Sequence, residues 1–126
     1  MGVRRPRAAG CALLAAAVGA AGLAAAATAA APATRNLTAT GKKLAFSRSS
    51  LSAPAGSVKL VLTNNSGTFR HNVSVKGDGI KVRKGKVVRK GGLSTVTIRL
   101  APGRYTYFCS VGSHAKNGMH GTLTVR

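Results

Sequence analysis

The sequence predicts an all-β domain, a sandwich of two packed sheets made from about six to eight short strands. Residues 34–126 show no sustained helical period of apolar residues. Several short stretches instead alternate apolar and polar residues or are rich in β-branched residues. Clusters of Gly, Asn, Ser and Pro separate these stretches, which is typical of strands that follow one another through tight turns.

Turn signals end the clearest of the predicted strands. The first signal is Asn64–Gly67, the second is Lys76–Gly79 and the third is Ala101–Gly103. In chain order the predicted strands are Leu37–Phe46, which supplies one or two, Val58–Thr63, His71–Val75, Thr95–Leu100, Arg104–Cys109 and Gly121–Val125. The segment Lys81–Lys90 has too few apolar residues for a core strand, so we expect an exposed basic loop or edge there.

Residues 1–33 have the pattern of a secretory signal peptide, and residues 34–126 would form the mature domain. A basic start with Arg4, Arg5 and Arg7 precedes an uncharged run rich in alanine, and small-residue cleavage sites follow, of which we take Ala31-Pro32-Ala33. A retained membrane anchor is the alternative, but the run is poorly apolar for its length. We therefore expect export to the periplasm, the cell envelope or the medium, with no membrane span after cleavage.

The charge is strongly unbalanced. The 126 residues carry 20 Lys and Arg against one acid, Asp78, for a formal net charge of +19. Such a field steers acidic partners, so we expect an acidic partner protein, with an anionic envelope surface as a second candidate. Nucleic acid would also suit the charge, but export and the absence of a nucleic-acid-binding motif argue against it. The length allows one small domain and excludes large multidomain enzymes.

The chemistry is concentrated between Cys109 and Met119, which hold all the sulfur of residues 34–126, with His114 between them. A lone thiol in an exported domain indicates a reactive group, an intermolecular link or a metal ligand. Thiolate and thioether are soft donors and imidazole is intermediate, so this set suits copper better than magnesium or calcium. A second histidine is needed, and His71, at the head of a predicted strand, is well placed to supply it. The predicted site is Cys109, His71 and His114 in a trigonal arrangement, with Met119 as a weak axial ligand.

These residues also allow other interpretations. Zinc accepts Cys and His, but it would leave Met119 unexplained and would require His120 as a fourth ligand. Adjacent residues of a strand face opposite ways, so we expect His120 at the surface. A structural thiol at Cys109 with Met119 as a core filler is a plain alternative. A Cys-His nucleophile is disfavoured because Asp78 is the only acid, and three histidines are too few for the additional copper centres of multicopper oxidases. We expect no enzyme activity.

The sequence resembles the cupredoxins, the small blue copper proteins of the plastocyanin, azurin and auracyanin group, over most of residues 34–126. The carriers of the resemblance are Arg70–Val73, Tyr105–Ser110, His114 and Gly118–Val125. The resemblance implies a Greek-key β-sandwich with one type 1 copper ion at His71, Cys109, His114 and Met119. It further implies that Asn72 and Ser110 hydrogen-bond across the two ligand segments, and that His114 lies near the surface as the port for electrons. The sequence departs from the family pattern at Gly112-Ser113, where relatives commonly have Pro-Gly.

Three functions follow from these observations. The first is an exported one-electron carrier with a type 1 copper centre, expected to be a monomer. The second is a copper-handling protein that buffers or delivers the metal. The third is a cationic envelope-binding module in which the metal site has lost its role.

Overall fold

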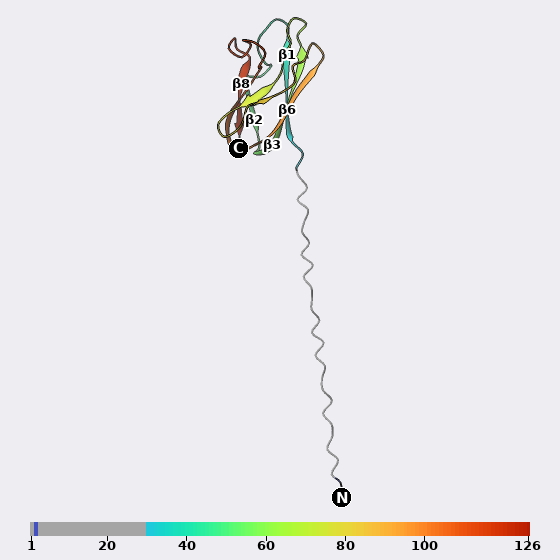
Figure 1. The fold of residues 1–126 in the computed structure, drawn as a ribbon, viewed down its shortest axis with the longest axis vertical. Helices are drawn as coiled ribbons and strands as arrows, with labels where there is room; N and C mark the ends of the chain where they lie inside the picture. Colours follow the sequence, from blue (N-terminus) through green and yellow to red (C-terminus); the bar gives the residue numbers. More distant parts are fainter. Residues whose placement is uncertain (1, 3–29) are drawn as a thin grey trace.

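The computed structural model describes Gly2 and residues 30–126, and its ordered elements are eight β-strands (Figure 1). In order these are β1 (Ala33–Thr40), β2 (Ser50–Ala53), β3 (Gly56–Asn65), β4 (Ser74–Lys76), β5 (Arg83–Lys84), β6 (Leu93–Leu100), β7 (Gly103–Phe108) and β8 (His120–Val125). These residues contain no helix. It follows that no helix suitable for crossing a membrane occurs in the described part of the chain. The predicted all-β class and strand number are confirmed, whereas most of the predicted leader lies outside the described residues.

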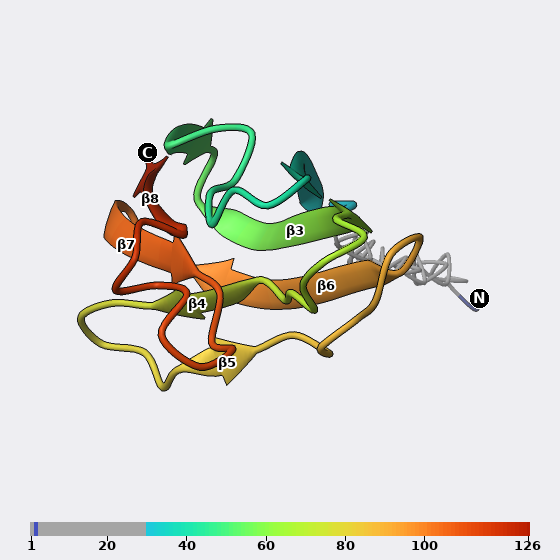
Figure 2. The same cartoon turned by 90° about the horizontal axis from the view of Figure 1, so that it is seen from above.

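The strands form two sheets. One has the order β1-β3-β6 and the other the order β2-β8-β7-β4-β5. β1 runs parallel to β3 and β2 runs parallel to β8, while the other pairs are antiparallel. Figure 2 shows the central strands of both sheets from above. The crossings between sheets bring the loop before β4 and the loop after β7 to the same end of the sandwich, because β4 and β7 are antiparallel neighbours.

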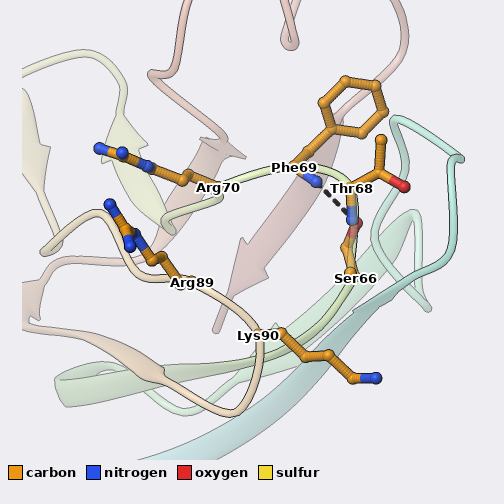
Figure 3. Close-up of a pocket in the computed structure, with 7 residues that line it drawn as sticks. Ser66, Thr68, Phe69, Arg70, Arg89 and Lys90 are labelled. Atoms are coloured by element: carbon orange, nitrogen blue, oxygen red, sulfur yellow. Dashed lines mark hydrogen bonds between the residues drawn. The ribbon is translucent and has the colours of Figure 1, made fainter.

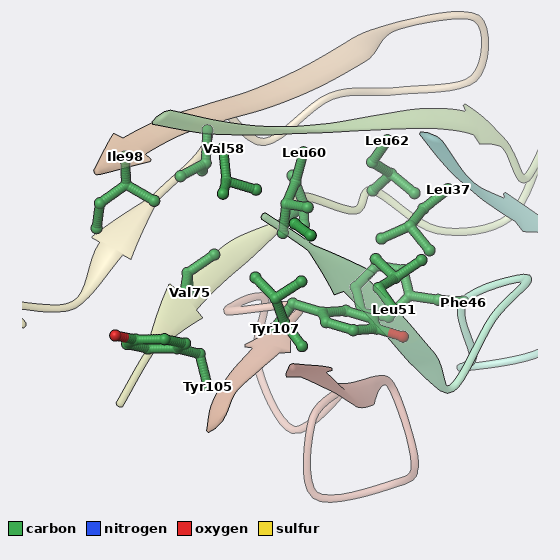
Figure 4. Close-up of a cluster of buried hydrophobic side chains, with 14 of the residues drawn as sticks. Leu37, Phe46, Leu51, Val58, Leu60, Leu62, Val75, Ile98, Tyr105 and Tyr107 are labelled. Carbon is green, nitrogen blue, oxygen red and sulfur yellow. The ribbon is translucent and has the colours of Figure 1, made fainter. Parts of the chain in front are cut away.

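The core lies between the two sheets and follows the alternation of the sequence. β6 alternates exposed and buried residues along its whole length, and every second residue of β3 from Val58 is buried. Figure 4 shows Val58, Leu60 and Leu62 facing Val75, Tyr105 and Tyr107 of the second sheet. One apolar face per sheet is what a two-layer sandwich requires, because the opposite face meets water.

Tyr107 fixes the register of β7 and β8 close to the two sulfur-bearing residues. It lies opposite Gly121, and a Cβ at Gly121 would overlap the tyrosine ring, so this position admits no side chain without a shift of the ring. The Tyr107 hydroxyl donates to the carbonyl of Arg48 at 2.6 Å, and burial raises the pKa of Tyr107 to about 12. Cys109 and Met119 each lie two residues from this pair, so the packing constrains both.

The structure differs from the predicted strands in three details. The range predicted from Leu37 contains one strand only, β1, which already begins at Ala33. β2 was missed because its four residues, SLSA, are too short and too rich in serine to show a clear pattern, although Leu51 and Ala53 are buried. His71 stands before β4 and pairs with Val88 in an isolated bridge, because Asn72 and Val73 between His71 and β4 are not part of a strand. The basic segment is an exposed edge as predicted, since β5 is the outermost strand of its sheet.

Candidate metal centre

His71 is held by backbone hydrogen bonds on both sides of its peptide. Its N–H donates to the carbonyl of Val88 at 3.1 Å, and the Val88 N–H donates back to the His71 carbonyl at 2.9 Å. The imidazole is completely buried. A paired backbone and a buried ring leave this side chain little freedom to move.

The second ligand segment is a loop of turns that connects β7 to β8. The Cys109 N–H donates to the Met119 carbonyl at 3.1 Å, which closes the loop at its base. The Met119 N–H donates to the His114 carbonyl at 3.0 Å, which folds the middle of the loop back onto its end. Gly112 and Gly118 have φ values of +46° and +115°, a region that favours glycine. The glycine at 112, where the sequence departs from the family pattern, thus meets a requirement of this turn.

The two segments bring three donor atoms together. Cys109 Sγ lies 3.6 Å from His114 Nδ1 and 3.9 Å from His71 Nδ1, and all three atoms lie within 4.8 Å of one another. A first-row ion about 2.3 Å from a thiolate and about 2.0 Å from an imidazole nitrogen, at an angle between tetrahedral and trigonal, separates these donors by about 3.5 to 3.7 Å. The Cys109–His114 separation falls within this range and the Cys109–His71 separation is slightly longer, so the three side chains lie close to the spacing that a single shared ion requires.

Met119 and His120 point in opposite directions, as the alternation along a strand predicts. Met119 is completely buried in the same core cluster as Cys109, and His120 is exposed. The prediction of a surface position for His120 is confirmed. His71, Cys109, His114 and Met119 are thus positioned as a type 1 copper site, and the exposed His120 is not available as the stronger fourth ligand that zinc would need.

A family model for the cupredoxin-like domain matches residues 13–125. The chain belongs to the cupredoxin family. No match was found among curated proteins.

Solved auracyanins have the same fold as this cupredoxin. Auracyanin B is 29% identical with a TM-score of 0.66, and the match covers 77% of this chain and 91% of auracyanin B. Dithionite-reduced auracyanin from Roseiflexus castenholzii is 22% identical with a TM-score of 0.66, covering 77% and 99%. Auracyanin A, a blue copper protein from Chloroflexus aurantiacus, is 24% identical with a TM-score of 0.65, covering 76% and 100%.

The electrostatics of the cupredoxin site favour neutral imidazole. Burial lowers the pKa of His71 from its usual 6.5, and the neighbouring His114 lowers it further. His71 Nε2 is buried and has no hydrogen-bond partner among the described residues, while Nδ1 faces the thiol. A proton on Nε2 leaves the Nδ1 lone pair available, which is the form in which histidine binds a metal.

Asn72 and Ser110 connect the two ligand segments, with the hydrogen bonds that the resemblance implies. The Ser110 N–H donates to Asn72 Oδ1 at 2.8 Å, and Asn72 Nδ2 donates to Ser110 Oγ at 2.7 Å. Asn72 Nδ2 also donates to the carbonyl of Gly85 at 2.9 Å, so the basic segment is attached to the same network. Asn72 directly follows His71 in the sequence, and Ser110 directly follows Cys109. The hydrogen bonds between Asn72 and Ser110 therefore restrict how far His71 and Cys109 can separate.

Phe69 is a residue of the site that sequence reasoning missed. Its ring lies edge-on to His114 with the centroids 5.4 Å apart, and 6.1 Å from His71. The two imidazole rings are themselves 5.1 Å apart. The chain has only three Phe and no Trp, so an aromatic residue two positions before a predicted ligand is unusual in this sequence. That position could have indicated that Phe69 belongs to the site.

Proposed function

We propose that this cupredoxin is an exported one-electron carrier whose copper ion is held by His71, Cys109, His114 and Met119. The observation that carries the proposal is the assembly of thiol and imidazole donors, already at metal-binding separation inside a closed β-sandwich. Copper, when bound, would supply the Cu(I)/Cu(II) couple. The task of the protein is to keep the donor atoms in place in both oxidation states, so that little reorganisation accompanies the transfer.

The surrounding packing supports that task. The His71–Val88 backbone pair holds one donor segment, and the bond between Cys109 and Met119 closes the other. The Asn72–Ser110 pair joins the two segments. The Cys109 and Met119 side chains are both buried, so water is excluded from the sulfur side of the site. His114 is half-buried and offers a route to the surface.

Export is the second part of the proposal. The basic, alanine-rich leader supports it, with cleavage after Ala33. β1 would then begin at Thr34, which pairs with Lys59, and would keep its buried residues Leu37 and Ala39. The mass of the chain recovered from an expressing bacterium tests this: an unprocessed N-terminus at residue 1 would contradict cleavage.

The spectrum of the copper-loaded protein tests the electron-transfer site. One equivalent of Cu(II) added to the purified full-length chain should produce an intense visible thiolate-to-copper band and the narrow copper hyperfine splitting of a type 1 centre in electron paramagnetic resonance. Cys109→Ser should abolish the band. Met119→Leu, a substitution of similar volume, should keep the band and change the reduction potential, because the axial ligand tunes it.

His120→Asn is the matched control, since it removes an exposed imidazole next to a proposed ligand. It should leave the spectrum unchanged. A pale, ordinary Cu(II) spectrum of the unmodified chain, or loss of the band in His120→Asn, would contradict the proposed site. Rapid transfer of Cu(I) to a competing chelator combined with slow electron self-exchange would favour metal handling instead.

A further inference from the structure

A basic hollow of about 390 Å³ lies beside the metal centre. It is lined by Ser66, Gly67, Thr68, Phe69, Arg70, Arg89 and Lys90 (Figure 3). Two segments form it, the loop that leads to His71 and the end of the basic segment. Residues 71–88 separate these segments in sequence, and three of the seven lining residues are cationic.

The two arginines are attached directly to the backbone pair that holds the site. Arg70 precedes His71 and Arg89 follows Val88. His71 and Val88 are joined by two backbone hydrogen bonds, one in each direction. Figure 3 shows the Arg70 and Arg89 side chains extending the same way, with Lys90 extending to the other side. Their relative position therefore depends on the same bridge that positions the ligand.

A buried asparagine makes the hollow a fixed feature of the fold. Asn64 is completely buried, and its Nδ2 donates to the Phe69 carbonyl at 3.0 Å and to the Val88 carbonyl at 2.8 Å. One amide group thus ties both walls together. Ser66 Oγ accepts from the Phe69 N–H at 3.1 Å and shapes the loop between them.

No acidic side chain of this chain is placed to pair with the cations of the hollow. Asp78 is the only acidic residue in the sequence, and it follows the far end of β4 whereas His71 precedes the near end. Arg70, Arg89 and Lys90 are all exposed. Guanidinium groups bind carboxylates through two parallel hydrogen bonds, so this pair is suited to acidic side chains of another molecule.

Phe69 connects the hollow to the metal centre. It lines the hollow, and its ring is the one that lies edge-on to His114. A molecule seated against Arg70 and Arg89 would lie next to the Phe69–His114 side of the site, where the half-buried ligand is. Among the described residues, the large apolar side chains that are exposed are Val82, Val87 and Leu93. None of them lines the hollow, which favours a charged protein segment over a lipid surface.

We propose that this hollow is the docking site for an acidic segment of the redox partner. The proposal rests on the electron-carrier function proposed above and adds a location and a chemistry for the partner. Carboxylates would pair with Arg70 and Arg89, and the partner's surface would contact Phe69 beside His114. Charge at this edge would thereby orient the partner toward the site rather than merely attract it.

Binding of a synthetic eight-residue peptide of alternating Asp and Glu tests the proposal. It is measured on the full-length chain by the amide shifts of residues 66–70 and 89–90 in nuclear magnetic resonance. Arg70→Gln/Arg89→Gln should weaken binding about tenfold or more, because each arginine–carboxylate pair is a charge-assisted hydrogen bond. The matched control is Arg99→Gln/Arg104→Gln. It removes the same charge from two exposed residues, one near the end of β6 and one near the start of β7, at the end of the sandwich away from the hollow. It should bind nearly as well as the unmodified chain.

Equal losses in the two double variants would overturn the docking site, since attraction would then depend on net charge alone. Binding to phosphatidylglycerol vesicles that is lost in Arg70→Gln/Arg89→Gln, without peptide binding, would also overturn it in favour of a lipid surface. A kinetic readout completes the test: the peptide should slow oxidation of the reduced copper protein by hexacyanoferrate(III) in the control but not in Arg70→Gln/Arg89→Gln. Because the shift measurement requires no copper, an ordinary Cu(II) spectrum would contradict the electron-carrier function separately from the docking site.

Discussion

The two histidines of the site are held in different ways. His71 is completely buried and is paired through its backbone with Val88. His114 is half-buried and stands in a loop of turns, where its N–H donates to the nearby Val111 carbonyl at 3.0 Å. One ligand is paired with a neighbouring segment through its own backbone. The other stands in a loop that its own turns, the Cys109–Met119 closure and the Asn72–Ser110 hydrogen bonds support.

This difference separates two requirements of an electron carrier. A ligand fixed within the sandwich limits the change in geometry that a change of oxidation state causes. A ligand at the surface shortens the path to the partner, but it is less shielded from water and from other ligands. The proposed electron-transfer site would meet both requirements by taking one histidine from each kind of segment.

The largest effect that would test this comparison comes from removing each imidazole in turn. His71→Gly and His114→Gly should both abolish the type 1 absorption band of the copper-loaded protein. Added imidazole should restore a strong band in His114→Gly, where the vacated position opens to solvent, and not in His71→Gly, where it is enclosed. Titration of both variants with imidazole, followed by visible absorption, measures this. Equal recovery would show that burial does not distinguish the two positions.

A smaller effect is expected from the connection between the two ligand segments. Asn72→Ala removes the acceptor of the Ser110 N–H and the donors to the Gly85 carbonyl and the Ser110 hydroxyl. It leaves the buried Gly85 carbonyl unpaired at a cost of about 1–3 kcal/mol, and the two part-buried groups of Ser110 unpaired at a lower cost. Loss of such support weakens metal binding by about 10- to 100-fold in other sites. Thermal unfolding and competition with a copper chelator give the two values.

Ser110→Ala is the matched variant, because it removes only the hydroxyl and leaves the Ser110 N–H bonded to Asn72. It should lower both the melting temperature and the copper affinity less than Asn72→Ala does. An equal loss in the two variants would mean that the hydroxyl, and not the backbone contact, joins the segments.

The smallest effect is a dependence of the metal-free protein on pH. Because burial lowers the pKa of His71 below 6.5, the unfolded chain binds this proton more readily than the folded chain does. The free energy of unfolding should therefore be highest above pH 6.5. It should decrease as the pH falls from 6.5 toward the lowered pKa of His71. Thermal unfolding in a chelator between pH 7.5 and 5 checks the direction.

His71→Asn should flatten this slope, whereas His120→Asn, which changes an exposed residue, should not. A slope that persists unchanged in His71→Asn would assign the dependence to other groups. Together the three predictions range from the identity of the ligands, through their support, to their protonation.

Patterns within single segments made much of this protein predictable. Alternation along Thr95–Leu100 predicted β6, and the same alternation placed Met119 inside and His120 outside. The elements that escaped prediction were short or irregular. β2 has four residues, and the His71–Val88 bridge joins two segments with no regular strand around either residue. Such pairings depend on contacts between distant segments, which no local pattern contains.

The sequence by itself determined the all-β class, the donor residues and the excess of positive charge, because these follow from residue types and their spacing. Only the tertiary structure decided how the donors meet, which imidazole is shielded, and that Asn64 joins the segments carrying Arg70 and Arg89 beside Phe69. The physical reason is that burial and hydrogen-bond partners are properties of the packed chain: residues far apart in sequence acquire them only when the two sheets close over a common core.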